Sequence, residues 1–179
     1  MVADIISGGT PSTTQNEYWD GNINWYSPAE IGDKIYVYES QRKITKLGLE
    51  NSSAKILPAN KTILFSSRAG IGSMAILKAP ATTNQGFQSL VLKDGYNTYF
   101  IYSMGHLIKN YAMKVASGST FLEISGKALG NMDVLVPNES EQIKIGTFFE
   151  KLDNLITLHQ RKLEHLQKQK KALLQQMFI

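Results

Sequence analysis

The sequence contains no cysteine, so it has neither disulfide bonds nor metal sites built on thiolates. Histidine is scarce as well: the three present, His106, His159 and His165, lie in segments with helical spacing and have no cluster of carboxylates nearby. A bound metal needs several such ligands at compatible spacings. The sequence therefore predicts no metal site.

The sequence also lacks a long uninterrupted hydrophobic run. No window approaches the roughly 18 apolar residues that a membrane-spanning helix needs. Residues 1–9 have neither the basic start nor the apolar stretch of a secretory signal. We therefore expect a soluble protein of the cytoplasm with no membrane partner.

Signatures of common active sites are missing too. The sequence has no P-loop, no His-Glu-x-x-His, no Gly-x-Ser-x-Gly, no Glu-x-Lys tripeptide typical of nucleases and no Asn/Asp-Pro-Pro-aromatic run of adenine methyltransferases. Residues 70–75 match a Gly-x-Gly-x-x-Ala dinucleotide loop, but a strand pattern and Pro80 follow where a phosphate-binding helix is required. These absences predict a non-catalytic chain without a cofactor of its own; a fragment of an enzyme is an open alternative.

Positive charge is distributed unevenly along the chain. The net charge is +4, yet residues 1–142 carry 12 basic and 12 acidic side chains, so the excess lies in residues 143–179, with 7 basic and 3 acidic. Residues 1–33 hold five acids and no Lys or Arg, whereas residues 34–68 hold seven bases against two acids, a local net charge of +5. Such a segment can neutralise phosphates through counterion release. A merely solvated basic surface is the open alternative.

The C-terminal region has the periodicity of a coiled coil. From position 143 onward there is no proline, and apolar residues recur in alternating steps of three and four. Asn138 and Glu141 form a variant capping box that predicts a helix over residues 139–177, directly after Pro137. That helix would be roughly 60 Å long at about 1.5 Å per residue. It is too long to bury its apolar side on the preceding domain, so we expect it to project and to pair with another helix.

The apolar seam of this helix, interrupted by two polar residues, consists of Phe149, Leu152, Ile156, His159, Leu163, Leu166, Lys170, Leu173 and Met177. Polar residues at core positions typically set the register and orientation of a coiled coil. Leu155, Leu158, Leu174 and Phe178 lie outside the seam and widen the apolar stripe. The wide stripe favours a bundle of more than two helices or extra partner contacts near both ends; a plain homodimeric coiled coil is the simpler alternative.

Residues 1–137 have the mixed pattern of an α/β (α+β) domain. Ser27 and Glu30 flank a capping box with proline at the first helical position, and Gly32 ends that short helix. Apolar spacing over residues 96–115 predicts the main helix of the domain. Strands are predicted at 55–57, 62–66, 73–77, 90–92, 121–124 and 132–136. The chain is thus divided into a globular domain, residues 1–137, and a long helix region, residues 138–179.

Four polar turns, each of which contains glycine, lie along the sequence of the domain. Glycine lets a ligand approach the backbone, and short hydroxyls donate to phosphate oxygens. Arg68 and Gln85 have side chains that can bind the edges of guanine and adenine, respectively, through paired hydrogen bonds. Ordinary loops share this composition, but its repetition beside a basic segment favours a nucleic-acid interface. We call these segments the first to fourth polar turns: residues 8–13, 66–70, 82–86 and 117–120.

A set of short segments follows in a characteristic order: DIISGGTPS (4–12), YWDGNINW (18–25), ILFSSRAGIG (63–72), TNQGF (83–87), SGST (117–120), VP (136–137) with EQI (141–143), LD (152–153) and KALLQQMF (171–178). In this combination the whole chain resembles the specificity (S) subunit of type I restriction-modification enzymes. Members of that family usually carry two units of domain plus helix, whereas this sequence has one, with a shortened strand before the Gly-Gly-Thr-Pro turn. The resemblance therefore indicates a half-subunit form that would have to dimerise.

The resemblance implies that residues 1–137 are a target recognition domain, which enters the major groove of double-stranded DNA and reads half of a gapped site. In the family, two antiparallel helices space the recognition domains and dock adenine methyltransferase subunits, which supply S-adenosylmethionine; the complex can include a motor-nuclease subunit. We expect the helix seam to form a homodimer. A coiled-coil adaptor whose head binds another protein is the alternative function.

We expect DNA contacts from Lys34, Arg42, Lys43, Lys46, Arg68 and Gln85, with Ser67, Ser117, Ser119 and Thr120 positioning the DNA backbone.

Overall fold

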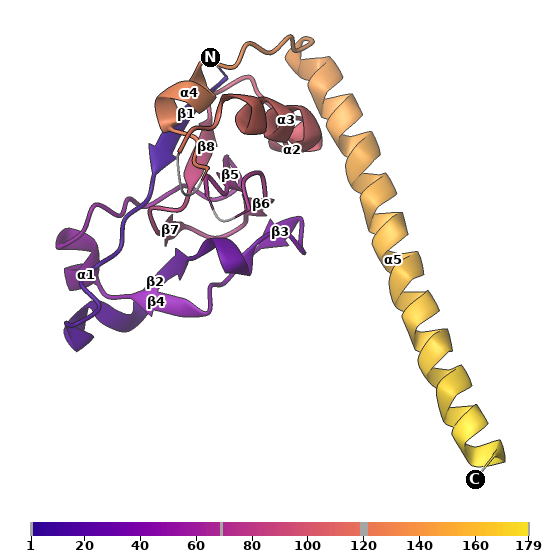
Figure 1. Ribbon diagram of the computed structural model, residues 1–179. Coiled ribbons are helices and arrows are strands. Elements are labelled where there is room, and N and C mark those ends of the chain that lie inside the picture. Colours follow the sequence, from indigo (N-terminus) through magenta and orange to yellow (C-terminus); the bar gives the residue numbers. More distant parts are fainter. Residues whose placement is uncertain (1, 69, 119–121, 179) are drawn as a thin grey trace.

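A computed structural model describes residues 2–68, 70–118 and 122–178 of the chain. Two short 3-10 turns, η1 (Asn16–Tyr18) and η2 (Pro28–Glu30), accompany the strands and helices. A mixed α+β head is followed by one long C-terminal helix that leaves it (Figure 1), which confirms the predicted fold class. The elements are β1 (Ala3–Ser7), β2 (Trp19–Tyr26), β3 (Tyr36–Val37), β4 (Arg42–Ile44), α1 (Lys46–Glu50), β5 (Thr62–Phe65), β6 (Met74–Leu77), β7 (Ala81–Thr83), β8 (Gln88–Leu92), α2 (Thr98–Ser103), α3 (Gly105–Val115), α4 (Gly126–Gly130) and α5 (Glu139–Met177).

Two sheets form the head. The larger has the strand order β1-β8-β5-β6-β3 and is antiparallel except for the β3–β6 pair. The smaller has the order β4-β2-β7, with β2 antiparallel to β4 and parallel to β7. Alternate side chains of a strand face opposite sides: Ile63 and Phe65 pack with α2 and α3, whereas Leu64 packs with Tyr26 and Ala81 of the small sheet. The large sheet is therefore the middle layer of the head (Figure 1).

The predicted strands 62–66, 73–77 and 90–92 correspond to β5, β6 and β8, but three others do not form. Residues 55–57 make only the bridge between Leu57 and Ala81, because Pro58 follows directly and interrupts the extended run. Residues 122–124 make only a bridge from Glu123, and residue 121 lies outside the described residues. Residues 132–136 form no strand and leave Leu135 99% exposed. An apolar run becomes a strand only where a neighbouring strand offers its backbone.

The two predicted helices of the head are also shorter than expected. Residues 96–115 form α2 and α3, separated at Met104; Gly105, at the start of α3, lies so close to Met74 that a Cβ there would be 3.0 Å from its sulfur. The helix after Ser27 is the single turn η2, held by the N–H of Ser27 donating to the Glu30 carboxylate at 2.9 Å. The sequence patterns do not predict strands β1, β2, β3, β4 and β7, whose residues alternate less regularly.

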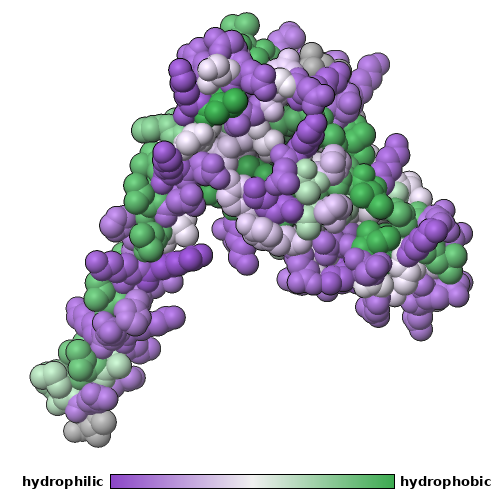
Figure 2. Space-filling view, turned by 180° about the vertical axis from the view of Figure 1, so that it is seen from behind, coloured by the Kyte–Doolittle hydropathy of each residue, from purple (hydrophilic) through white to green (hydrophobic). Residues whose placement is uncertain are grey.

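Helix α5 spans the residues that the sequence predicts. The side chain of Asn138 accepts a hydrogen bond from the N–H of Glu141 at 3.0 Å, which confirms the N-cap. Only the beginning of α5 packs on the head, against α2, and the rest extends away from it (Figure 1). The apolar seam residues are between 41 and 72% exposed, and Figure 2 shows apolar groups along the projecting arm. Within the described residues this seam has no partner.

Polar contacts fix the start of α5 on the head. The side chain of Gln142, which is 2% exposed, accepts a hydrogen bond from the N–H of Asn97 at 3.1 Å. Further along, the hydroxyl of Tyr99 donates to Asp153 at 2.7 Å, and the hydroxyl of Tyr36 donates to Glu150. Burial, and then these bonds to carboxylates, raise the pKa of both tyrosines, so they remain protonated donors. The head therefore sets the direction in which α5 leaves it.

Gly146 lies so close to α2 that a side chain does not fit. A Cβ at this position would lie 2.5 Å from Oδ1 of Asn97 and 3.0 Å from the backbone nitrogen of Phe100. Helix propensity alone predicts that Gly146→Ala stabilises α5 by about 1 kcal/mol. We expect instead that the clash lowers the free energy of unfolding by about 1 kcal/mol net, measured by urea denaturation at one protein concentration.

The matched control is Thr147→Ala, one position along α5, where the side chain is exposed. This substitution improves helix propensity without a clash and should stabilise the chain slightly. Equal stabilisation by both substitutions would contradict the docking of α5 on α2.

Candidate functional site

Three of the four polar turns are joined by backbone hydrogen bonds. The N–H of Gly9, in the first turn, donates to the carbonyl of Thr83, in the third, at 2.8 Å. The N–H of Ser67, in the second turn, donates to the carbonyl of Gly86, also in the third, at 2.8 Å. A Cβ at Gly8 would lie 2.1 Å from a backbone oxygen of the third turn, so only glycine allows this approach. Segments far apart in the sequence thus lie side by side.

The fourth polar turn is attached to the second. The N–H of Ile124 donates to the carbonyl of Ser67 at 3.1 Å. Ser117 and Glu123 exchange two backbone hydrogen bonds of 3.1 and 3.0 Å. The described residues of the four turns therefore form one region of the head, which we call the polar edge.

Gln85 and Arg68 place an amide and a guanidinium at the polar edge. Gln85 is exposed, and the hydroxyl of Thr10 donates to its Oε1. Among the described residues, no hydrogen bond engages its NH₂ group, which can donate to a ligand. Arg68 is half-buried, and its side chain lies close to the third turn: a Cβ built at Gly86 would be 3.4 Å from its Nε. The structure thus brings these two predicted contacts into one region.

Arg42, on β4, is anchored to the same region through two tryptophans. Its guanidinium carbon lies 3.7 Å from the ring centroid of Trp19 and 5.6 Å from that of Trp25. Such a cation–π contact contributes about 0.5–1 kcal/mol at an exposed site. The indole N–H groups of Trp19 and Trp25 donate to the carbonyls of Ser12 and Gly9 at 3.1 and 2.9 Å. The first polar turn, the tryptophans and Arg42 therefore form one connected unit.

The other predicted cations are placed differently. Lys43 forms an ion pair with Glu39, and Lys46 forms one with Glu50 at 3.7 Å. The hydrogen bond from Lys43 lowers the pKa of the exposed Glu39 carboxyl, which therefore stays charged. Lys34 is exposed in the loop before β3. Carboxylates thus offset part of the +5 charge of residues 34–68.

Ser67 does not lie where a DNA backbone could contact its side chain. It is 0% exposed, because its N–H and carbonyl are both used to join neighbouring segments of the polar edge. Its hydroxyl has no hydrogen-bond partner among the described residues. Ser117 is exposed at the edge, whereas Ser119 and Thr120 lie outside the described residues. The expected role of Ser67 in positioning the DNA backbone is therefore not supported by its burial.

Sequence reasoning does not identify Trp19 and Trp25 as part of this region. They are the only two tryptophans of the chain and lie six residues apart on β2. The register of β2 against β4 shifts between Trp19 and Ile23, so spacing alone does not place the two rings together; their contact is seen only in the structure. The strand itself is obscured by glycine and asparagine between the tryptophans.

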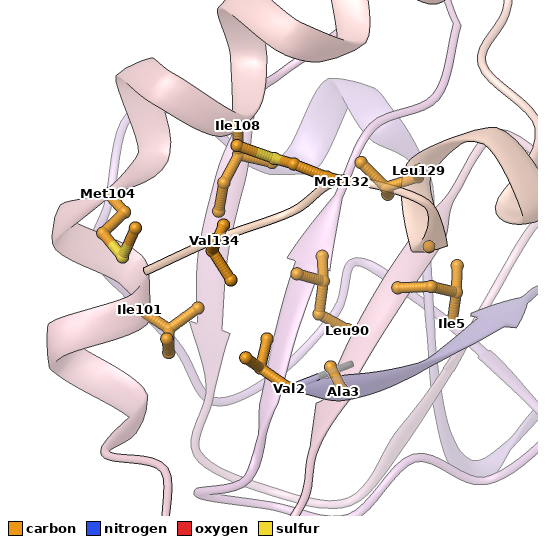
Figure 3. Close-up of a pocket in the computed structure, with 11 residues that line it drawn as sticks. Val2, Ala3, Ile5, Leu90, Ile101, Met104, Ile108, Leu129, Met132 and Val134 are labelled. Carbon is orange, nitrogen blue, oxygen red and sulfur yellow. The ribbon is translucent and has the colours of Figure 1, made fainter. Parts of the chain in front are cut away.

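Two cavities of different character lie in the described part of the head. One, of about 40 Å³, lies between the large sheet and α2–α3 and is lined only by apolar residues and one glycine (Figure 3). The other is an open hollow of about 530 Å³ at the base of α5, bordered by His106, Lys109, Phe149 and Asp153. Across residues 2–68, 70–118 and 122–178, no group of three or more His, Asp or Glu side chains could hold a metal ion.

In the same part of the chain, none of the helices combines the length and apolar character needed to cross a membrane.

The sequence matches a protein family described as "Type I restriction modification DNA specificity domain" over residues 2–168. It is 36% identical over 182 residues to the type I restriction enzyme MjaIX specificity subunit of Methanocaldococcus jannaschii, covering 99% of this chain and 42% of that protein. It is 32% identical over 162 residues to the EcoR124I/EcoR124II specificity subunit of Escherichia coli, covering 86% of this chain and 39% of that protein.

The fold is similar to that of a chain in a solved structure described as the basis of complex assembly and conformational transition of the type I R-M system. The TM-score is 0.75 at 19% identity, over 96% of this chain and 41% of that chain. At this identity the likeness shows the fold alone. The chain spans about two fifths of the length of these relatives.

Ser66 and Ser67 are adjacent buried serines that differ in their hydrogen bonds. Both are 0% exposed. The Ser66 hydroxyl donates to the carbonyl of Gly70 at 2.7 Å and accepts from the N–H of Ser73 at 2.9 Å, whereas the Ser67 hydroxyl has no partner in the part of the chain that the structure describes. We expect Ser66→Ala to lower the free energy of unfolding by about 1–3 kcal/mol, because it leaves buried groups unsatisfied. Ser67→Ala should leave that free energy unchanged or raise it.

Urea denaturation of the two variants provides the measurement, and each serves as the control of the other. An equal loss of stability in both would contradict the difference in bonding.

Proposed function

The chain belongs to the type I restriction modification DNA specificity family, and from this we propose that it recognises one half of a gapped DNA target and recruits an adenine methyltransferase to it. The observation that carries the proposal is the convergence of the polar turns with Arg42, Arg68 and Gln85 at one edge of the head. Guanidinium and amide side chains recognise base edges in the major groove. Backbone N–H groups and short hydroxyls bind phosphates and position the duplex.

No chemical step is assigned to the chain itself. Specificity subunits are generally non-catalytic, so methyl transfer from S-adenosylmethionine to an adenine would belong to the methyltransferase subunits. A motor-nuclease subunit would be a further partner, acting on unmodified DNA. The chain would work in the cytoplasm, together with these partners and their DNA.

The exposed seam of α5 supports pairing with a second copy of the chain. An antiparallel pair in which Leu163 of one copy faces Leu166 of the other buries the seam in apolar layers. The same register places Leu152 opposite Met177 and Ile156 opposite Leu173. The end of the second helix would then lie beside Leu152, next to the open hollow at the base of α5.

The two polar residues of the seam favour this orientation. In the antiparallel register His159 of one copy faces Lys170 of the other, so both interruptions share a layer. In a parallel pair Lys170 would face Lys170 across the seam, and like charges at a core position disfavour that arrangement. From Leu152 to Met177 the register therefore pairs apolar residues with apolar residues and puts the two polar residues in one layer.

Apolar side chains beside the seam offer a surface for the methyltransferase. Leu155, Leu158, Leu174 and Phe178 are 53, 61, 45 and 79% exposed and lie outside the seam. A two-helix pair leaves such flanking residues at its margin, where a further protein can cover them. The positive charge of residues 143–179 lies along the same helix and would remain accessible there.

The absence of cysteine allows a direct test of the orientation. Leu152→Cys and Met177→Cys, each made alone, should not form disulfide-linked dimers, because the two equivalent positions of an antiparallel pair lie about 37 Å apart along the helix axis. A mixture of the two variants should cross-link under mild oxidation. Non-reducing gel electrophoresis measures both results, and efficient cross-linking of either single variant alone would indicate a parallel pair.

The proposed function is tested by mapping methylated adenines in cells that express this chain with the methyltransferase encoded beside it. Two identical heads related by a two-fold axis should read identical half-sites on opposite strands, giving a gapped palindrome. Expression of the methyltransferase without this chain is the control and should leave that motif unmodified. An asymmetric two-part motif would contradict the homodimer, and methylation independent of the chain would contradict the recruitment role.

A further inference from the structure

Arg42 differs from the neighbouring cations in how its charge is used. Lys43 and Lys46 are paired with Glu39 and Glu50, whereas none of the salt bridges found among the described residues involves Arg42. Its side chain is exposed although its guanidinium is stacked on an indole ring. Stacking occupies one face of the planar group and leaves the N–H donors along its edges open. Arg42 therefore presents a fixed, unpaired donor edge to its surroundings.

The platform beneath Arg42 is rigid. Trp19 and Trp25 are 7 and 5% exposed, and their rings meet edge to face at 5.1 Å and 89°. Both indole N–H groups are bound to carbonyls of the first polar turn. Burial and these hydrogen bonds hold both rings in one orientation, so the guanidinium rests on a surface that does not rearrange.

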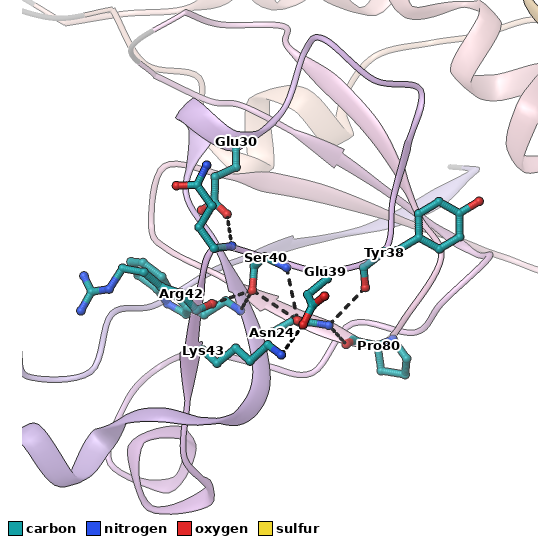
Figure 4. A network of polar contacts seen from close by, with 10 residues as sticks. Asn24, Glu30, Tyr38, Glu39, Ser40, Arg42, Lys43 and Pro80 are labelled. Atoms are coloured by element: carbon teal, nitrogen blue, oxygen red, sulfur yellow. Dashed lines mark hydrogen bonds and ion pairs between the residues drawn. The ribbon is translucent and has the colours of Figure 1, made fainter.

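The backbone that carries Arg42 is held as tightly. The hydroxyl of Ser40 donates to the carbonyl of Arg42 at 2.5 Å and accepts from the N–H of Trp25 at 2.8 Å. The N–H of Gln41 donates to the carboxylate of Glu30 at 2.7 Å. Figure 4 shows these bonds converging behind Arg42, whose guanidinium end extends away from them. The fixed backbone and the contact with Trp19 thus favour one conformation of the Arg42 side chain in the free protein.

We propose that Arg42 recognises a guanine in the major groove, donating two hydrogen bonds from one edge of its guanidinium to O6 and N7 while Trp19 supports its face. This inference rests on the proposed function. The fork of a guanidinium matches these two acceptors, whereas a lysine ammonium acts as a point charge. Ordering in the free protein reduces the side-chain entropy lost on binding, which favours a specific contact over a mobile surface charge.

A phosphate contact by Arg42 would behave differently. It requires positive charge but no particular base, so lysine would replace arginine without a change in sequence preference. Arg42→Lys therefore separates the two roles, because it keeps the charge and removes the fork. Arg42→Gln removes both the charge and the fork. Its matched control is Lys93→Gln. Lys93 is an exposed lysine whose ammonium pairs at 3.6 Å with Asp4, a residue of β1 in the large sheet.

The experiment uses the full chain with its methyltransferase and has two readouts. Methylome mapping should show that Arg42→Lys relaxes a single guanine position in each half-site, with discrimination falling roughly 5- to 150-fold. In gel shifts, replacing that guanine by 7-deazaguanine, which lacks N7, should weaken binding of the unsubstituted chain and leave binding by Arg42→Lys almost unchanged. Lys93→Gln should retain the original motif, and near-equal unfolding midpoints of the variants confirm that they are folded.

The outcomes separate this inference from the proposed function. If the unsubstituted complex recognises a motif and Arg42→Lys retains every guanine preference, Arg42 is not a base-reading residue, although the proposed function stands. Uniform weakening at all positions in Arg42→Gln, with Arg42→Lys unaffected, would indicate a phosphate contact and overturn the proposal. If the unsubstituted complex shows no sequence preference, the proposed function fails and this inference with it.

Discussion

Helix α5 carries more apolar surface than the head can cover, and the arrangement of the whole chain follows from this. Its beginning is fixed on the head by Gln142, by the close approach at Gly146 and by the bonds from Tyr36 on β3 and Tyr99 on α2. Beyond them the seam is exposed along the rest of the helix. Because the head sets the direction of α5, pairing of two such helices would set the distance and orientation of two heads. Under the proposed function, the junction of α5 with the head would thus link the spacing of two heads to their recognition surfaces.

The polar turns of the head are organised around shared backbone hydrogen bonds. The carbonyls of Thr83, Gly86 and Ser67 accept bonds from three other segments and so hold the polar turns together. Such a region has exposed donors in fixed positions, which suits recognition of a regular polymer better than activation of a substrate. The match of residues 2–168 to the type I restriction modification DNA specificity domain agrees with that role.

Patterns that depend on neighbours in sequence predicted parts of the fold well. The helix over 139–177 and its Asn138 cap are confirmed, as are the strands of the buried runs at β5, β6 and β8. Strands β2 and β4 were not predictable in the same way, because glycine, asparagine and charged residues interrupt their alternation. They form because each lies against a partner strand, which no local pattern encodes.

Local sequence therefore specifies α5, its seam, the polar turns and the candidate side chains Arg68 and Gln85. Tertiary structure alone decides that these turns share one edge, that Ser67 is buried within it, and that Arg42 is stacked on Trp19. The reason is physical: helical periodicity and turn chemistry depend on residues a few positions apart. The polar edge depends on hydrogen bonds and ring contacts between residues that are distant in sequence, and these exist only once the two sheets have packed.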